Sequence, residues 1–101
     1  MVVDLDREAV KRGLADGSFT LVDVREPHEF EMGHIPGSLS HPLSQFDPDA
    51  LRNLPGRVVF TCAAGVRSVH AIAFAQQGGL AVREHYAGGF KDWALAGEPI
   101  A

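Results

Sequence analysis

The chain has 101 residues, 46% hydrophobic and 22% charged, which is typical of one folded domain over residues 1–101 and excludes a disordered polymer. Its formal net charge of −4 opposes binding to phosphate backbones, so nucleic acid is not an expected partner. No apolar run approaches the ~20 residues of a membrane span and no export signal is visible, so we expect no membrane association and a cytoplasmic location.

Strand and helix patterns alternate along the chain. In order, they predict a strand at 2–3, a helix from Asp4 or Asp6 to about Leu14, a strand at 20–24, a helix at 27–32, strands at 38–41 and 57–61, a helix at 67–77, a strand at 82–86 and a helix at 90–95. The runs at 20–24 and 57–61 are apolar and β-branched, as in strands buried on both faces of a parallel sheet. Phe90 and Trp93, three residues apart, are predicted to pack in the core, with lining of the pocket rim as the alternative. The alternation predicts an α/β fold, a parallel sheet flanked by helices on both faces.

The strand at 57–61 runs directly into the only cysteine, Cys62, and then into a loop of small residues. The loop and the start of the next helix comprise Ala63, Ala64, Gly65, Val66, Arg67 and Ser68. In an open parallel sheet, ligands bind beyond the carboxyl ends of the strands, where this loop is expected to lie. Small residues leave backbone amides free to point at one anionic atom, and the helix N-terminus adds positive potential. We therefore predict that Cys62 is a low-pKa nucleophile; the alternative is a small buried hydrophobic residue.

Four blocks, in this order, resemble the rhodanese-like family of sulfurtransferases. They are residues 21–25 (LVDVR), Glu29-Phe30 with 33–37 (GHIPG), 62–68 (CAAGVRS), and Gly88-Gly89-Phe90 with Trp93 and 97–99 (GEP). The resemblance extends from about Leu21 to Ile100. It implies a rhodanese-like parallel sheet flanked by helices, and a persulfide on the residue that matches Cys62.

The resemblance also implies an activity, the transfer of a sulfane sulfur from thiosulfate or a similar donor to cyanide or a thiol, including thioredoxin-like acceptors. The Cys62 thiolate attacks the donor, and a second nucleophile then removes the sulfur. Arg67 is the predicted cation that orients the donor or braces the loop, and Ser68 opens the following helix. Ala63 stands where many thiosulfate-using members carry a basic residue, so another sulfane-sulfur compound or a protein persulfide is an alternative donor.

Two other activities stay open. The same domain could carry a persulfide, or sense or bind a partner, with little turnover. A phosphatase of the same fold is a weaker alternative, because the loop from Cys62 to Arg67 has six residues, one fewer than in the phosphatase branch, and Thr61 stands where many cysteine phosphatases have a histidine. The histidines and carboxylates form no metal-binding pattern and the glycines no nucleotide-binding motif, so we expect neither a metal nor a cofactor.

Four residues near the predicted site have simpler structural explanations. Asp23 and Arg25, at the end of a strand, predict an ion pair that fixes a turn, with tuning of the pocket as the alternative. Glu29 is predicted to be an exposed charge, with a contact to Arg25 as the alternative. His34 lies among turn residues, and we predict that its side chain forms a hydrogen bond that braces the turn.

Overall fold

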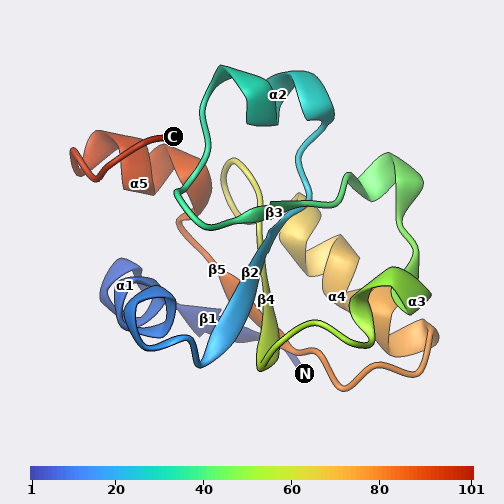
Figure 1. The fold of residues 1–101 in the computed structure, drawn as a ribbon. Coiled ribbons are helices and arrows are strands. Elements are labelled where there is room, and N and C mark those ends of the chain that lie inside the picture. The colour runs from blue at the N-terminus through green and yellow to red at the C-terminus, as the bar shows by residue number, and fades with distance from the viewer.

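The computed structural model describes residues 1–101, which build one parallel sheet between two layers of helices. Its strands are β1 (Val3–Leu5), β2 (Phe19–Asp23), β3 (Leu39–Ser40), β4 (Arg57–Thr61) and β5 (Glu84–Tyr86), in the spatial order β1-β5-β4-β2-β3 (Figure 1). Strands β2 and β4 pair residue by residue, from Phe19 with Arg57 to Asp23 with Thr61. Both strands therefore end at the same level, and the next residue of β4, Cys62, leaves from the carboxyl edge of the sheet.

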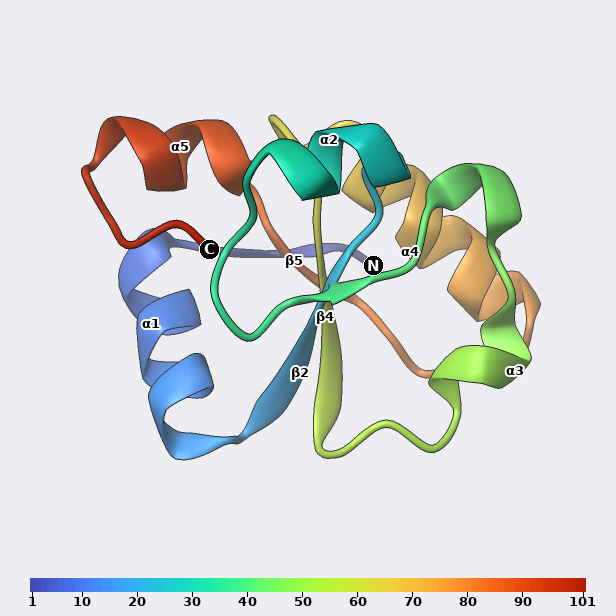
Figure 2. The same cartoon turned by 45° about the horizontal axis from the view of Figure 1, so that its top comes forward.

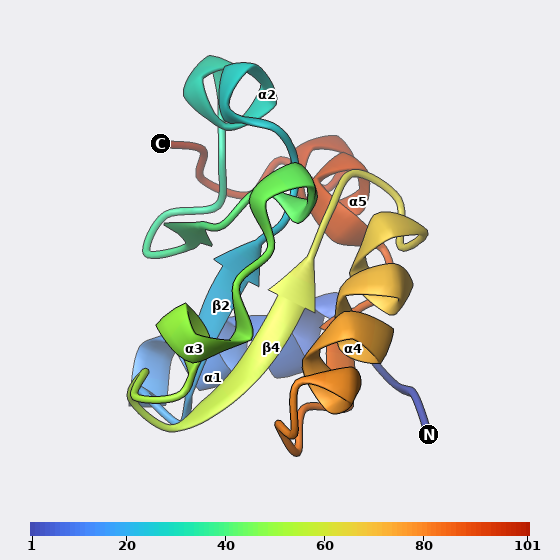
Figure 3. The same cartoon turned by 90° about the vertical axis from the view of Figure 1, so that its right-hand side faces the viewer.

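Helices cover both faces of the sheet. They are α1 (Arg7–Asp16), α2 (Pro27–Met32), α3 (Pro48–Leu51), α4 (Arg67–Gln77) and α5 (Gly89–Leu95), with a 3-10 turn η1 (Leu43–Gln45). Helices α1 and α5 lie on one face, and α3 and α4 lie on the other (Figures 1 and 3). Helix α2 lies on neither face but beyond the carboxyl ends of β2 and β4, as the tilted view shows (Figure 2). The prediction of a parallel sheet flanked by helices on both faces is confirmed.

Two hydrophobic clusters, one on each face of the sheet, explain why the middle residues of the central strand β4 are apolar. Successive side chains of a strand point to opposite faces, so Val59 joins the cluster under α1 and α5 while Phe60 joins the cluster under α3 and α4. Trp93 is buried in the first cluster and Phe90 is partly buried against it, which confirms their predicted packing role. No helix has the length and apolar character needed to cross a bilayer.

The element bounds differ from the predicted ones mainly in the strands. Strand β1 extends to Leu5, so Asp4 belongs to the strand, and Asp6 alone caps α1 by accepting the Ala9 amide (2.8 Å). The run predicted at 82–86 forms a strand only from Glu84, because pairing with β4 begins there. The predicted strands at 20–24 and 38–41 occupy 19–23 and 39–40, and α3 was not predicted at all. Such short elements have too few residues for a sequence period to define them.

Candidate active site

The loop that follows β4 folds around the sulfur of Cys62. The Gly65 amide donates a hydrogen bond to Sγ (3.1 Å), and the Ser68 amide, in the first turn of α4, donates a second (3.4 Å). Gly65 has φ +87°, and a Cβ there would lie 2.5 Å from the Ala87 carbonyl oxygen, so this bend requires glycine. The sulfur therefore sits where backbone donors converge at the N-terminus of a helix.

The start of α5 fastens the same loop from the opposite side. The Phe90 amide donates to the carbonyl of Cys62 (2.8 Å), and the Lys91 amide donates to that of Ala63 (3.0 Å). Only glycine at position 89 lets the start of α5 lie this close to the loop, because its φ is +64° and a Cβ would lie 2.5 Å from the Cys62 carbonyl oxygen. With both carbonyls held outward, the loop amides remain free to face the sulfur.

These contacts favour the ionised form of Cys62. Burial alone would raise the pKa of the thiol, since only 1% of the residue is exposed. Hydrogen bonds from the Ser68 hydroxyl and amide, and from the Ala64 and Gly65 amides, outweigh that effect and hold the pKa below its ordinary value. A thiol with these surroundings is a ready nucleophile at lower pH than a free cysteine.

Ser68 also links the sulfur to two residues that the sequence did not single out for the site. Its hydroxyl oxygen lies 3.5 Å from Cys62 Sγ and 2.7 Å from Nδ1 of His85, and Nε2 of His85 lies 2.7 Å from a carboxylate oxygen of Asp4. Asp4 and His85 are paired residues of β1 and β5. They are 81 residues apart in the chain, and no local motif signals the contact.

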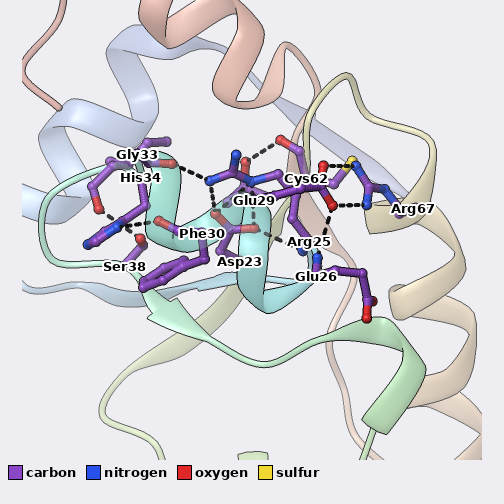
Figure 4. A network of polar contacts seen from close by, with 12 residues as sticks. Asp23, Arg25, Glu26, Glu29, Phe30, Gly33, His34, Ser38, Cys62 and Arg67 are labelled. Atoms are coloured by element: carbon purple, nitrogen blue, oxygen red, sulfur yellow. Dashed lines mark hydrogen bonds and ion pairs between the residues drawn. The ribbon is translucent and has the colours of Figure 1, made fainter. Parts of the chain in front are cut away.

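Arg67 forms an ion pair with the acidic side chain of Glu29. Its guanidinium donates two hydrogen bonds to the carboxylate of Glu29, at 2.6 and 3.0 Å, and so ties α2 to the cysteine loop (Figure 4). The Arg67 hydrogen bond lowers the pKa of Glu29 to about 2. The prediction of an exposed charge at Glu29 is thereby corrected, because the fold brings Arg67 to it across 38 residues of chain. Arg25, the alternative partner, acts on Glu29 through its charge, as the weakest of the causes that lower the Glu29 pKa.

Asp23 and Arg25 form a buried ion pair. They are 1% and 4% exposed, and the Arg25 guanidinium donates to both carboxylate oxygens of Asp23. It also donates to the Gly33 carbonyl (2.8 Å; Figure 4). The guanidinium lies 4.4 Å from the ring centre of Phe90. The predicted ion pair is confirmed, and it joins the end of β2 to the end of α2 and the start of α5.

His34 braces the turn after α2, as predicted. Its Nδ1 donates to the Phe30 carbonyl (3.0 Å), and its ring stacks on the Phe30 ring with centroids 3.8 Å apart. The backbone of His34 also exchanges two hydrogen bonds with that of Ala101.

Cys62 lies in an enclosed cradle and outside every surface cavity of the molecule. The largest cavity, about 740 Å³, lies at the amino edge of the sheet and is lined by residues that include Arg57, Val82 and Glu84. The other three cavities are also lined by residues other than Cys62 and its loop. The predicted loop residues are thus brought around one sulfur atom, with Val66 and Ala64 on the exposed side.

Comparisons with known proteins agree with this geometry. Residues 6–96 match the family described as the rhodanese-like domain. A sulfurtransferase of Allochromatium vinosum is 36% identical over 103 residues, covering 99% of this chain and 95% of that protein. The thiosulfate:glutathione sulfurtransferase of Saccharomyces cerevisiae is 34% identical over 110 residues, covering 89% of this chain and 76% of that protein.

A solved structure is similar as well. The human single-domain sulfurtransferase TSTD1 superposes with a TM-score of 0.74 at 29% identity, covering 91% of this chain and 95% of that one. The chain spans about half the length of several other curated relatives, at 56%, 45% and 43%. Similarity to sulfurtransferases along the chain supports sulfur transfer as its general chemistry.

Proposed function

This chain belongs to the rhodanese-like domain family, and on that premise we propose that it moves a sulfane sulfur from a small-molecule donor to a thiophilic acceptor through a persulfide on Cys62. The observation that carries the proposal is the convergence of the Gly65 and Ser68 amides and the Ser68 hydroxyl on one buried sulfur. Such donors stabilise a thiolate both before attack and when it leaves again. We take residues 1–101 to act as one domain in a reducing, cytoplasmic setting, where Cys62 stays a free thiol.

The reaction has two balanced steps. In the first, Cys62 Sγ forms a bond to the sulfane sulfur of the donor while the bond from that sulfur to the rest of the donor breaks, and the electron pair leaves with the remnant. With thiosulfate, the remnant is sulfite. In the second, the acceptor attacks the outer sulfur, and the bond to Cys62 breaks to return the thiolate. No external oxidant or reductant is needed, and ping-pong kinetics are expected.

The charges of the loop bear on the choice of donor. Ala63 supplies no cation, and the Arg67 guanidinium is already paired with Glu29 at two points. A thiosulfate dianion therefore meets few unpaired positive groups, and we propose that thiosulfate is used less readily than a less charged sulfane donor such as a low-molecular-weight or protein persulfide. For the acceptor we propose a small thiol or a thioredoxin-like protein thiol, with cyanide as a convenient substitute; the yeast relative is by name a thiosulfate:glutathione enzyme.

Intact-mass measurement tests the proposal. The protein is exposed to thiosulfate or to glutathione persulfide, freed of donor, and compared with a Cys62→Ser control. We expect the parent to gain the mass of one sulfur atom, more completely with the persulfide, and to lose it rapidly on addition of glutathione or cyanide. Absence of a sulfur adduct with any donor, or equal transfer by Cys62→Ser, would overturn the mechanism. A sulfur that loads but is not released would favour a carrier or sensor, and phosphate release from an aryl phosphate would favour the phosphatase.

A further inference from the structure

A chain of hydrogen bonds leads from the buried sulfur of Cys62 to the surface on the side of the sheet that α4 covers. It passes from Sγ to the Ser68 hydroxyl, then to Nδ1 of His85, and from Nε2 of His85 to the carboxylate of Asp4. Cys62, Ser68 and His85 are at most 3% exposed, whereas the Asp4 side chain is 71% exposed because β1 is an edge strand. Loop, helix and two paired strands thus contribute one residue each.

The chemistry of the end residue fixes the direction of every bond in the chain. A carboxylate only accepts hydrogen bonds, so Asp4 requires the proton of the His85 ring to be on Nε2. In the neutral ring Nδ1 is then an acceptor, and the Ser68 hydroxyl donates to it. That leaves the lone pairs of the Ser68 oxygen to accept the S–H of Cys62, and the thiol state is fully satisfied.

The same four groups are equally satisfied after one proton has moved. When the Cys62 proton passes to the Ser68 oxygen and the Ser68 proton passes to His85 Nδ1, the ring becomes an imidazolium. Its Nδ1–H then donates to Ser68, and the proton that Ser68 received from Cys62 makes the hydroxyl a donor to the thiolate. Asp4 still accepts from Nε2 and now faces a cation. Only the two protons move and no hydrogen bond is lost, so the chain has two complete states.

We propose that His85 holds the proton of the Cys62 thiol, received through Ser68, and that Asp4 fixes the tautomer that makes the transfer work. Ser68 contacts the reacting sulfur, while His85 and Asp4 are positioning residues that act through it. This relay rests on the proposed function in one respect, because its product is the thiolate that would attack the donor.

Two other cations lie near the sulfur. Arg67 of α4 is paired with Glu29 of α2, and Arg25 is paired with Asp23 of β2. Neither guanidinium is hydrogen-bonded to Sγ, and Arg67 acts on the thiolate through its charge alone. Asp4 of β1 is the ionic partner that the structure records for His85. A buried thiolate is costly without a compensating cation, and His85 is the group connected to it that can become one.

The position of the proton can be observed directly. Ring-nitrogen chemical shifts of His85, measured by NMR at neutral pH on the full chain, should be those of an imidazolium in the parent. In Cys62→Ser the donated proton is missing, and the same ring should be neutral. A ring of the same charge in both proteins, whether neutral or protonated, overturns the relay.

Titration of the thiolate gives a second and independent test. The ultraviolet absorbance of the Cys62 thiolate is followed against pH, with Cys62→Ser subtracted to remove the aromatic contributions. His85→Asn keeps a polar group near Ser68 but cannot take up a proton, so the midpoint should rise by at least one pH unit, which is a tenfold loss of thiolate at a pH below the midpoint. Asp4→Asn should shift it by less, in the same direction.

Both His85→Asn and Asp4→Asn are measured so that the test gives a result even if one of them does not fold. Asp4 is exposed on an edge strand, so Asp4→Asn is expected to fold even where the buried His85→Asn does not. An unchanged midpoint in the folded variants overturns the relay, whereas a purely structural role of His85 would alter stability and leave the midpoint in place. Neither test needs a sulfur donor. If the parent transfers sulfur and the variants leave the midpoint unshifted, the relay alone is disproved. If the variants shift the midpoint but the parent takes up no sulfur, the proposed function alone is disproved.

Discussion

The carboxyl and amino edges of the sheet differ in how deeply their charged side chains are buried. At the carboxyl edge lie Cys62, the buried Asp23–Arg25 pair and the Glu29–Arg67 pair. At the amino edge, the Arg57–Glu84 pair joins the first residues of two strands, with the Arg57 side chain 54% exposed. The amino edge nevertheless has the largest cavity. The candidate site lies where strand-to-helix loops direct backbone donors inward, so cavity size is a poor guide to it.

The largest predicted effect of this difference is at Arg25. Arg25→Met leaves the Asp23 carboxylate buried without its cation, retaining only the backbone amide of residue 25 as a donor. We expect the free energy of unfolding to fall by about 3–5 kcal/mol, as for other broken buried pairs. Urea denaturation measures the loss.

A matched double variant separates the lost pair from lost packing. Asp23→Leu combined with Arg25→Met removes the stranded charge, so it should be less destabilised than the sum of the two single variants. A cost below about 1 kcal/mol for Arg25→Met would place this pair with exposed ones and remove the contrast between the two edges.

The Glu29–Arg67 pair is predicted to have an intermediate effect that depends on pH. Its hydrogen bond from Arg67 lowers the pKa of Glu29 from 4.5 to about 2, so the native state resists protonation more than the unfolded chain does. The stabilisation is complete above pH 4.5 and is lost as the pH falls toward about 2. Because the pair is partly exposed and screened by water, we expect Glu29→Gln to cost about 1 kcal/mol at neutral pH.

Unfolding curves of the parent and Glu29→Gln, recorded at a series of pH values, check this expectation. The two proteins should approach equal stability at the acidic end. A gap that stays constant through the acid range would mean that the carboxylate charge contributes nothing to the contact.

The smallest effect is predicted at the amino edge. Glu84→Gln keeps the shape of the side chain and removes the charge facing Arg57 (2.7 Å), a pair whose cation is largely in water. We expect a loss of about 0.5 kcal/mol, reduced further by added salt, and unchanged sulfur loading in the intact-mass measurement. A loss as large as that of Arg25→Met, or a change in loading, would show that the two edges are not independent.

The sequence predicted the parts of this molecule that depend on neighbours along the chain. Strand β4, helix α4 and the small-residue loop between them form one continuous segment, so composition and spacing were sufficient to predict them. The Asp23–Arg25 pair, two residues apart at a strand end, is local in the same sense.

The contacts that sequence reasoning missed join distant segments. Glu29 meets Arg67 because α2 lies over the carboxyl edge, and His85 meets Asp4 because the first strand of the chain pairs with the last. The register of β1 on β5 sets the second contact, and three-residue strands have no period from which a register could be predicted.

The near-complete burial of Cys62 has a consequence for regiochemistry. A persulfide has two electrophilic sulfur atoms, and an incoming thiol that strikes the inner one forms a mixed disulfide with the protein and expels hydrosulfide. Here the inner atom would be Sγ of a residue that is 1% exposed and surrounded by its own loop, while the outer atom would extend one bond further from the protein backbone. In the proposed persulfide, shielding of the inner atom would direct a thiol to the terminal sulfur, so that this sulfur would be transferred and Cys62 would not remain in a mixed disulfide.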